Sequence, residues 1–321
     1  MPASDARGPI RVVAGVLRDA KGRVLVARRQ PGKHLAGLWE FPGGKQHRGE
    51  AAPAALAREL DEEIGVTLVA SVPLVTIRHE YPGKTVRLDV HEVLDYRGTP
   101  RAREGQPLAW RRTSELAALP MPAADRPIVT ALALPDRYLI TPPCTPADGE
   151  SLLAGIEAAC SAGVRLVVLR QPAWPRAQIG ALARKARAIC RRHGARLLAH
   201  DDPALARRLA LDGVHLSWRR AAILGRRPRN LAGWFAVSCH DAAELAHAQH
   251  IGADFAVLSP LRRTPSHPGA LPLGWRRARR LAHDAGLPVY FLGGLGPADV
   301  MKARQHGARG IAAIRGLWPG G

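Results

Sequence analysis

The chain is 321 residues long, carries a formal net charge of +20 and is 46% hydrophobic. This length suffices for two domains that each bury a core of their own. No stretch approaches eighteen uninterrupted apolar residues, and the N-terminus lacks an apolar segment typical of a signal peptide, so the composition argues against a membrane protein. The four cysteines are widely spaced and form no CxxC pair, which favours a reducing cytoplasm over disulfide bonds or bound zinc.

The positive charge is concentrated in the second half of the chain. Residues 1–134 hold 20 Lys and Arg against 15 Asp and Glu, whereas residues 135–321 hold 27 against 12. A basic surface can attract nucleic acids or anionic metabolites. The arginines stand in scattered pairs without interleaved aromatic residues, which is more typical of solvated helix faces in an arginine-rich composition. We therefore expect no stable nucleic-acid partner.

The first half alternates strands with helices. An apolar run at residues 10–17 and a turn at 19–22 precede a second strand at 24–27. Further strands are expected at 74–79, 86–94 and 108–111, and a closing helix at about 125–134. Mixed strands with a helix on each side predict an α/β/α sandwich over residues 1–134.

Residues 44–66 read G-K-Q-H-R-G-E-A-A-P-A-A-L-A-R-E-L-D-E-E-I-G-V. Pro53 suits the first turn of a helix, and the good helix formers that follow predict a helix to Ile64. Glu59, Glu62 and Glu63 are spaced i,i+3 and i,i+4, so they share one helix face. Such carboxylates repel one another unless a multivalent cation lies among them, and hard oxygen ligands suit Mg²⁺, with Mn²⁺ as a substitute. The alternative is a solvated acidic helix face.

This segment resembles the Nudix box at every fixed position. The flanking segments resemble the MutT branch of that family, whose members hydrolyse oxidised purine nucleoside triphosphates. The residues that carry the resemblance are Gly44, Glu50, Arg58-Glu59-Leu60, Glu62-Glu63 and Gly65-Val66, with 38–45, 104–106, Trp110 and 119–132 outside the box. The resemblance spans roughly residues 8–134 and also implies an α/β/α sandwich.

The resemblance implies a metal site and the catalytic groups beside it. The expected ligands are three helix carboxylates, a loop carboxylate and a backbone carbonyl: Glu59, Glu62, Glu63, Glu104, and Gly43 or Gly44. Glu104 would approach from its loop as a ligand or as the general base. The choice of base stays open, with Glu59 slightly favoured. Arg58 is expected to orient Glu59 or Glu50.

The resemblance also implies a nucleotide pocket. Its expected residues are Arg29, His34, Glu40, Phe41, Pro42, Gly43, Lys84 and Asp125. Arg29 matches an arginine that binds the phosphates, although a plain surface arginine is the alternative. Lys84 stands where family members often have arginine, so it can act as a point charge but not as a bidentate fork.

Asp125 departs from the family at the position that contacts the base. The family pattern is Pro-Ala-Asn-Glu-Pro, and its Asn amide both donates and accepts hydrogen bonds, whereas this chain reads Ala124-Asp125-Arg126-Pro127. An ionised Asp only accepts, so it would take the N7–H of 8-oxoguanine but repel O6 unless it were protonated or turned. The alternative is that Asp125 caps the closing helix.

In the second half, short apolar strands alternate regularly with segments of helical length. Eight such units in residues 135–321 predict a compact (β/α)8 TIM barrel. The expected strands are 138–141, 166–169, 196–199, 213–216, 235–238, 255–258, 289–292 and 311–314.

This half resembles thiamine-phosphate synthase and its relative, the TenI-type tautomerase. The resemblance rests on Tyr138–Thr141, Leu169-Arg170, His200-Asp201, Asp212–Leu216, Ser238, His240, Gly252–Asp254, Ser259-Pro260, Thr264 and Gly293–Leu295. Several synthase residues are replaced. Val168 and Pro172 stand where a Gln and a Lys are expected, Ser217, Trp218 and Arg220 replace a Gly-Gln pair and a metal-binding Asp, and Thr264–His267 replaces Thr-x-Thr-Lys. Loss of those charges should cripple departure of a pyrophosphate.

The barrel is therefore expected to be a degenerate ligand-binding or tautomerase-like domain, with an active synthase as the alternative. Its ligand would be a thiamine-related phosphate. The expected phosphate-binding residues are Arg170, Ser259, Gly293 and Gly294, the last two through their backbone N–H groups.

The leading hypothesis is a Mg²⁺-dependent hydrolase that converts 8-oxo-dGTP, or a related nucleotide, to the monophosphate and pyrophosphate. An alternative keeps this chemistry but acts on diphosphates of thiamine metabolism, as the attached barrel suggests. A third class, a non-catalytic reader of oxidised guanine, would lack the box carboxylates that this chain retains.

Overall fold

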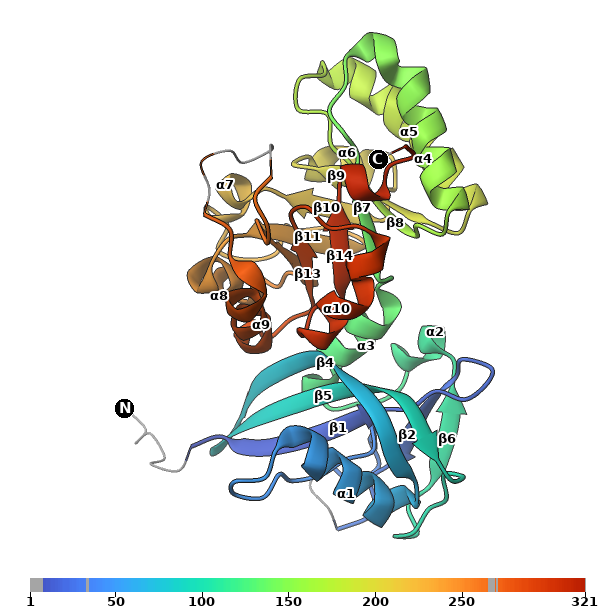
Figure 1. Ribbon diagram of the computed structural model, residues 1–321, viewed down its shortest axis with the longest axis vertical. Helices are drawn as coiled ribbons and strands as arrows, with labels where there is room; N and C mark the ends of the chain where they lie inside the picture. The colour runs from blue at the N-terminus through green and yellow to red at the C-terminus, as the bar shows by residue number, and fades with distance from the viewer. Residues whose placement is uncertain (1–7, 33–34, 265–268, 270, 321) are drawn as a thin grey trace. The chain divides into compact units, whose positions relative to one another are not determined.

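The computed structural model describes residues 8–32, 35–264, 269 and 271–320. The chain forms two compact units, Met1–Ala133 and Leu134–Gly321. Figure 1 traces both from the N-terminus in blue to the C-terminus in red. Among the described residues, no helix combines the length and the apolar character needed to cross a membrane.

The first unit is a mixed α/β domain. Its elements are β1 (Ile10–Val16), β2 (Val24–Arg28), β3 (Trp39–Glu40), α1 (Ala52–Ile64), β4 (Thr67–Tyr81), β5 (Lys84–Arg97), β6 (Leu108–Arg111), α2 (Thr113–Leu116), the 3-10 turn η1 (Ala123–Asp125) and α3 (Arg126–Ala133). One sheet has the order β1-β5-β4, with β1 parallel to β5, and the other has the order β3-β2-β6.

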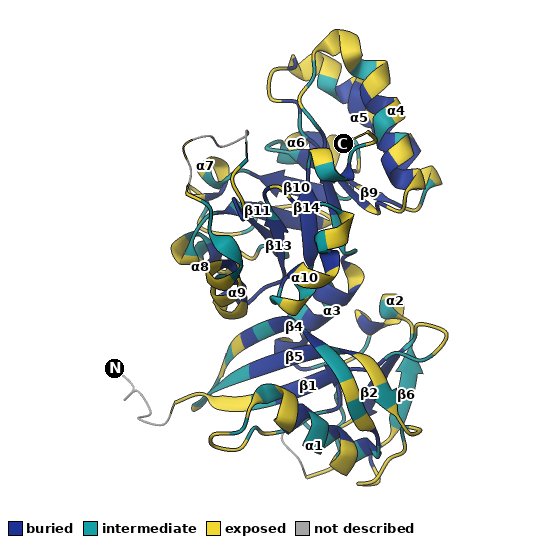
Figure 2. Ribbon diagram, viewed as in Figure 1, coloured by how far each residue is buried: buried dark blue, intermediate teal, exposed yellow. Residues whose placement is uncertain are grey.

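The strands of this domain are covered on both faces. Alternate residues of β1 point to opposite sides, so Val13 packs with the buried face of α1, whereas Ala14 packs in the cluster that contains Ile128 of α3. The covering face of α1 consists of Ala55, Leu56, Leu60 and Ile64, and its opposite face is exposed (Figure 2). The arrangement is the α/β/α sandwich predicted from the sequence.

The sequence predicted most elements of this domain, but the two strands of the long hairpin were predicted too short. β4 and β5 extend well beyond the predicted 74–79 and 86–94. Their pairing continues past register shifts near Ala70 and Pro73, because a bulge lets a ladder resume after an irregular residue. The two-residue β3 was not predicted, and the closing helix starts at Arg126, one residue later than predicted.

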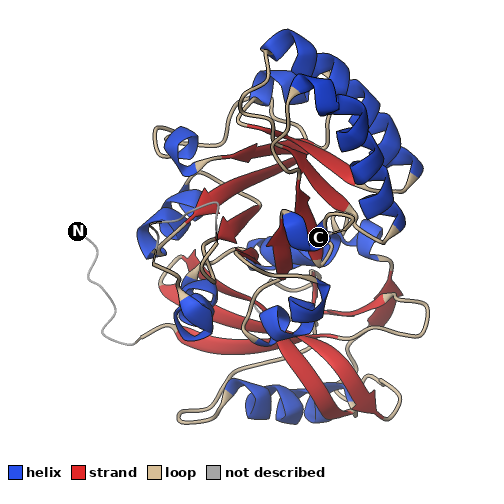
Figure 3. Ribbon diagram, turned by 45° about the horizontal axis from the view of Figure 1, so that its top comes forward, coloured by secondary structure: helices blue, strands red, loops and turns tan. Residues whose placement is uncertain are grey.

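The second unit is a closed barrel of eight parallel strands in the order β10-β11-β12-β13-β14-β7-β8-β9. Figure 3 draws the strands in red and the helices in blue. The strands are β7 (Arg137–Ile140), β8 (Leu166–Leu169), β9 (Arg196–His200), β10 (Gly213–Leu216), β11 (Trp234–Cys239), β12 (Phe255–Leu258), β13 (Val289–Leu292) and β14 (Gly310–Ala313). The TIM barrel predicted from the sequence is therefore confirmed.

Helices and short turns connect the barrel strands. They are η2 (Pro146–Asp148), α4 (Gly149–Ser161), α5 (Arg176–Arg192), α6 (Pro203–Arg208), α7 (Trp218–Ala221), α8 (Ala242–His250), α9 (Gly274–Asp284), η3 (Pro297–Asp299), α10 (Val300–Gln305) and η4 (Arg315–Leu317). The apolar strands are buried on both faces, because one side meets the barrel interior and the other meets the helices. Tyr138 and Phe255 fill the interior, whereas Leu139 and Leu258 pack outward.

Leu60 tests the packing of α1 against the first sheet. Its side chain is fully buried, so Leu60→Ala should destabilise the first domain by about 2–5 kcal/mol. Hydrogen exchange of peptides from residues 52–64, followed by mass spectrometry, would measure the loss. Val69→Ala serves as a control because Val69 is 48% exposed, and a surface change of this kind should cost no more than about 0.5 kcal/mol. Equal losses in the two variants would contradict this packing.

Candidate active site

A glycine loop lies directly against β1 in the first domain. The N–H groups of Val13 and Gly15 donate to the carbonyls of Gly44 and Pro42, at 2.9 and 2.8 Å. Gly43 has φ +149, and a Cβ at this position would lie 2.1 Å from the carbonyl oxygen of Val13. Only glycine therefore permits this close approach.

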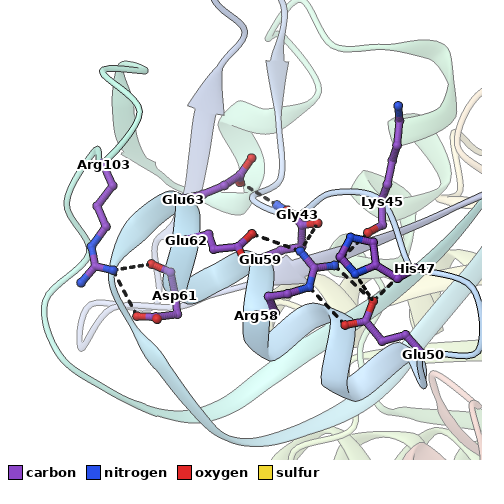
Figure 4. A network of polar contacts seen from close by, with 10 residues as sticks. All are labelled: Gly43, Lys45, His47, Glu50, Arg58, Glu59, Asp61, Glu62, Glu63 and Arg103. Atoms are coloured by element: carbon purple, nitrogen blue, oxygen red, sulfur yellow. Dashed lines mark hydrogen bonds and ion pairs between the residues drawn. The ribbon is translucent and has the colours of Figure 1, made fainter.

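One face of α1 carries the three predicted acids, and Arg58 contacts Glu59 and Glu62 but not Glu63 (Figure 4). Arg58 Nη1 donates to Glu59 Oε1 at 2.8 Å and to Glu62 Oε2 at 3.1 Å. Its Nε and Nη2 donate to the two oxygens of Glu50, and Nη2 also donates to the carbonyl of Lys45. The contacts with Glu50 and Glu59 raise the pKa of Arg58, so it remains a cation. Arg58 thus orients both Glu50 and Glu59.

Glu63 turns to the other side of the same face. Its Oε2 accepts the N–H of Gly43 at 3.0 Å. Burial raises the pKa of Glu63 to about 7, against the effect of that N–H, and the negative charges of Glu104, Glu40 and Glu59 raise it further. Negative charge therefore accumulates where the helix meets the glycine loop.

Glu104 lies on a loop that is bound along the C-terminal end of α1. The N–H of Arg103 donates to the carbonyl of Glu63 at 3.0 Å, and the side chain of Gln106 donates to the same carbonyl at 2.8 Å. Gln106 also accepts the N–H of Glu104, and Gln30 donates to the Glu104 carbonyl. These contacts place Glu104 close enough to Glu63 to raise its pKa.

The acids fit a hard divalent cation in their chemistry, but their side chains are not gathered around one point. Across the described ranges, no three Asp, Glu, His or Cys side chains converge closely enough to hold a metal ion. The reason is that Glu59 and Glu62 turn to Arg58, whereas Glu63 turns to Gly43. A Cβ on Gly44 would lie 2.2 Å from Glu59 Oε2, so this glycine leaves room for a carboxylate beside the loop. Carboxylate and carbonyl oxygens are the ligands that Mg²⁺ prefers.

A cavity of about 410 Å³ adjoins the glycine loop and brings together most of the predicted nucleotide residues. The predicted residues that line it are Arg29, Glu40, Phe41, Gly43, Gly44, Glu63, Lys84 and Asp125. Arg29 Nε and Glu40 Oε2 form an ion pair at 2.8 Å. Arg58, Glu59, Glu62 and Glu104 are not among its lining residues, so Glu63 is the acid that joins the acidic face to the cavity.

Pro42 was predicted for the pocket but does not line the cavity. Its carbonyl instead accepts the N–H of Gly15 on β1. His34 lies outside the described residues.

The sequence analysis missed the apolar walls and Tyr81. The walls include Val12, Val86 and Leu88, and Tyr81 ends β4 beside them. Lys84 Nζ lies 5.6 Å from the centre of the Tyr81 ring, so the β4–β5 turn holds its cation over an aromatic face. The turn sequence Tyr81-Pro82-Gly83-Lys84 was the available signal.

Asp125 is buried in the wall of this cavity. Asp125 is 6% exposed, and among the described residues its Oδ2 has no hydrogen-bond partner, so this oxygen does not cap α3. Burial raises the pKa of Asp125 to about 7. The charge of Glu40 adds to this effect and Arg29 opposes it.

The barrel has a smaller cavity of about 80 Å³ at the C-terminal ends of β12, β13 and β14. Ser259, Gly293 and Gly294, all predicted to bind phosphate, line it. Gly293 has φ +124, and a Cβ there would lie 2.7 Å from the N–H nitrogen of Leu261. Arg315, which begins η4 two residues after β14, also lines the cavity and was not predicted, although a cation followed by Gly316 after an apolar strand was an available signal.

Arg170, the fourth predicted phosphate residue, does not line that cavity. It follows β8, which is separated from β13 by β14 and β7 in the barrel order. Arg170 instead lies near His200 and His215. Burial lowers the pKa of His215 to about 3, and the interactions with His200 and Arg170 lower it further. His215 contacts Tyr138 Oη at 2.7 Å and Ser238 Oγ at 2.8 Å.

The replaced synthase positions have new partners. Ser217 donates its N–H and its hydroxyl to Asp201, at 2.7 and 2.8 Å. Arg219 and Arg220 line a pocket with Asp201, so positive charge occupies the region where the synthase pattern has a metal carboxylate. Pro265–His267 of the third altered motif lie outside the described residues.

The acidic helix, the glycine loop against β1 and the α/β/α sandwich define a Nudix hydrolase domain. The closed ring of parallel strands with a cavity at its C-terminal ends defines a TIM-barrel domain.

Comparison with known proteins identifies both families. Residues 13–131 match the family described as NUDIX domain, and residues 137–317, more than half of the chain, match the family described as thiamine monophosphate synthase. The chain therefore belongs to the thiamine monophosphate synthase family through its barrel and to the Nudix family through its first domain, which is that of a pyrophosphohydrolase.

Individual relatives agree with this assignment. The CTP pyrophosphohydrolase of Escherichia coli is 36% identical over 122 residues, which cover 38% of this chain and 90% of the relative. The 8-oxo-dGTP diphosphatase of the same organism is 32% identical over 123 residues, 38% of this chain and 95% of the relative. The putative thiamine-phosphate synthase 2 of Aquifex aeolicus is 32% identical over 186 residues, 57% of this chain and 97% of the relative.

The raised pKa of Asp125 predicts a stability difference that depends on pH. The folded protein holds this proton up to about pH 7, whereas the ordinary pKa is 3.8, so ionisation of Asp125 opposes folding increasingly between these values. Asp125→Asn should therefore stabilise the first domain above pH 7, by on the order of a few kcal/mol, and have little effect below about pH 4. Thermal unfolding of both proteins across this range would measure the difference. A gain independent of pH would contradict the prediction.

Proposed function

We propose that the first domain hydrolyses an oxidised purine nucleoside triphosphate, with 8-oxo-dGTP as the leading candidate, to the monophosphate and pyrophosphate. The main support is the single cavity that joins Arg29, Glu40 and Asp125 to Glu63 of the acidic helix. The similarity to an 8-oxo-dGTP diphosphatase adds to it. The reaction would remove oxidised nucleotides from the pool before DNA replication.

The candidate residues have different expected roles, which follow from where each one lies. Arg29 and Lys84 supply positive charge in the cavity, where the phosphates need it. Arg58 holds Glu50 and Glu59 in place. Mg²⁺, with Mn²⁺ as a substitute, would be held by Glu59, Glu62, Glu63, Glu104 and a carbonyl of Gly43 or Gly44, and would neutralise charge on the phosphates during attack by water. Glu59 remains the favoured general base over Glu104.

A second candidate is a nucleoside triphosphate whose base carries an amino group, such as CTP. Three carboxylates, Glu40, Glu63 and Asp125, line the cavity, and an ionised carboxylate only accepts hydrogen bonds. An exocyclic amine donates them. A relative named CTP pyrophosphohydrolase is 36% identical over this domain. The thiamine-pathway alternative rests on the attached barrel.

Hydrolysis of a substrate panel tests these proposals. The full chain with Mg²⁺ would be given 8-oxo-dGTP, dGTP, CTP and thiamine diphosphate, and pyrophosphate or phosphate release would be measured. We expect the highest kcat/KM for 8-oxo-dGTP. Higher turnover of CTP would establish the second candidate, and equal or higher turnover of thiamine diphosphate would replace both.

The acidic helix should carry the chemical step. Glu59→Gln and Glu63→Gln each remove a carboxylate from the expected metal set, and we expect kcat to fall at least about 100-fold, or about 2.7 kcal/mol. Glu80→Gln is the matched control, because the Glu80 side chain is 76% exposed on β4, and its activity should be unchanged. Retention of full activity in both helix variants would reject the assignment of the chemical step to the acidic helix, and absence of hydrolysis in the original chain would favour a non-catalytic reader.

For the barrel, we propose a domain that binds a thiamine-related phosphate, in a degenerate or tautomerase-like role. The support is the cavity formed by Ser259 with the Gly293-Gly294 turn, and Arg315 beside it. Arg262 fixes this turn by donating to the carbonyl of Gly294 at 2.8 Å and pairing with Asp299 at 2.7 Å. The loss of the synthase's metal carboxylate disfavours departure of a pyrophosphate, because that step needs a metal ion where negative charge develops.

Thermal shift would test the barrel proposal. Thiamine phosphate, a thiazole phosphate and inorganic phosphate should each raise the unfolding temperature, and Gly293→Ala should abolish the effect because its Cβ would meet the Leu261 backbone. Gly225→Ala is the control, since nothing lies within 4 Å of a Cβ there. Formation of thiamine phosphate by the full chain would instead establish an active synthase.

A further inference from the structure

Residues of α5 and α6 (Figure 1) line a groove on the outside of the barrel. Its volume is about 700 Å³, and four arginines contribute to its walls. Arg176 and Arg184 belong to α5, and Arg207 and Arg208 belong to α6. Of these, only Arg176 also lines one of the two barrel pockets described above. The groove is therefore a separate feature of the barrel.

Small residues lie between these arginines. Arg176, Gly180 and Arg184 recur every four residues, so they share one face of α5. A Cβ at Gly180 would lie 3.3 Å from Arg208 Nη2, so the absence of a side chain lets this guanidinium group of α6 lie close to α5. Two alanines also line the groove. The space between the charged groups is thus left open by the sequence.

The groove has little negative charge of its own. Asp202 is the only acid among the described residues that line it, against four arginines. Its Oδ1 accepts the N–H of Leu205 at 2.8 Å, so this carboxylate caps α6. Guanidinium groups that share a groove repel one another, and arginine cannot relieve the repulsion by losing its proton. An anion bound between them would remove that repulsion.

The cations of α5 that face α4 have acidic partners instead. Lys185 pairs with Glu150 at 2.5 Å, and Arg192 pairs with Glu157 at 3.0 Å. Across the part of the chain that the structure describes, none of the four groove arginines forms an ion pair or a side-chain hydrogen bond. Their N–H donors are therefore available to a ligand.

The groove suits a chain of several phosphates. Arginine binds phosphate oxygens through two parallel N–H groups. Arg176 and Arg184 lie about 12 Å apart along the axis of α5, because a little more than two helical turns separate them. A single phosphate does not span that distance, whereas a chain of phosphates does. No aromatic residue is among the described lining residues, so the groove lacks the stacking surface typical of sites for single-stranded nucleic acids.

We propose that the groove between α5 and α6 binds a chain of several phosphates, either an inorganic oligophosphate or the phosphate chain of a nucleotide. Arg176 and Arg184 contact one side of the chain, and Arg207 and Arg208 contact the other. The inference is independent of hydrolysis in the first domain, because all four arginines belong to the barrel domain.

Calorimetric titration of the full chain in metal-free buffer would test the proposal, with tripolyphosphate as the probe. Arg184→Gln/Arg208→Gln removes one cation from each helix, and we expect the affinity to fall at least about tenfold. Arg279→Gln/Arg280→Gln is the matched control. It removes the same charge from exposed positions of α9, which follows β12 on the opposite side of the barrel. At physiological ionic strength the control should change the affinity less than about twofold.

Gly180→Met tests the shape of the groove without changing its charge. Methionine is a good helix former, and its side chain would occupy the space beside Arg208. We expect a loss of affinity for tripolyphosphate of the same order as in the double variant. Thermal unfolding without ligand would show that each variant folds.

Hydrogen exchange followed by mass spectrometry would locate the bound probe. Tripolyphosphate should protect peptides from residues 176–184 and 203–209, and Arg184→Gln/Arg208→Gln should remove this protection. The cavity of the first domain and the Gly293-Gly294 turn are unchanged in every variant, so any binding there contributes equally to all titrations.

Comparison ligands identify the source of the phosphates. Equal affinity for tripolyphosphate and ATP would assign recognition to the phosphate chain alone, and tighter binding of ATP would assign the groove to a nucleotide. Orthophosphate that bound as tightly as tripolyphosphate, an equal loss in the α9 control, or no protection of the two segments would overturn the inference. Tighter binding of single-stranded DNA, lost in Arg184→Gln/Arg208→Gln, would replace the oligophosphate with a nucleic acid.

Discussion

The site of the first domain depends on how closely the backbone of Gly43 and Gly44 approaches two other elements. A Cβ at Gly43 would lie 2.1 Å from the Val13 carbonyl of β1, and one at Gly44 would lie 2.2 Å from Glu59 of α1. Because neither glycine has a side chain, the loop fits between strand and helix, offers its N–H to Glu63 and forms part of the cavity wall. The position of the acids relative to the nucleotide cavity follows from this one fit.

Both domains use glycine backbone at their candidate sites, but they surround it differently. In the first domain the glycine loop faces carboxylates, a composition that suits cations and the polyphosphates bound to them. In the barrel the Gly293-Gly294 turn faces Ser259 and Arg315, a composition that suits an anion directly. Glycine backbone therefore forms part of both sites, and the neighbouring side chains determine whether the site favours a cation or an anion.

The sequence predicted elements well where periodicity and burial agree, and poorly where side-chain direction decides. Strands β8, β10, β12 and β13 have the predicted bounds, because each is a short apolar run that is buried on both faces. Helical spacing placed Glu59, Glu62 and Glu63 on one face of α1, but it could not show that Arg58 and Gly43 divide them. Spacing gives the position of a side chain and not its competing partners.

Long-range contacts limited the prediction of the sites in the same way. Arg170 and Gly293 both follow strands, yet the closed order of the barrel separates them. Asp125 was identified from its position in a motif, whereas its burial depends on how η1 packs beside β3 and β4, which no local pattern reveals. The two-residue β3 escaped notice because it is too short to show alternation.

Arg58 gives the acidic helix a resident positive charge. Arg58 Nη1 donates to both Glu59 and Glu62, so a divalent ion that bound these carboxylates would have to displace the guanidinium group. Part of the binding free energy of the ion would be offset by the loss of those hydrogen bonds. Exchange of one cation for another would make binding of a divalent ion weaker and more readily reversible than binding to carboxylates without a resident cation.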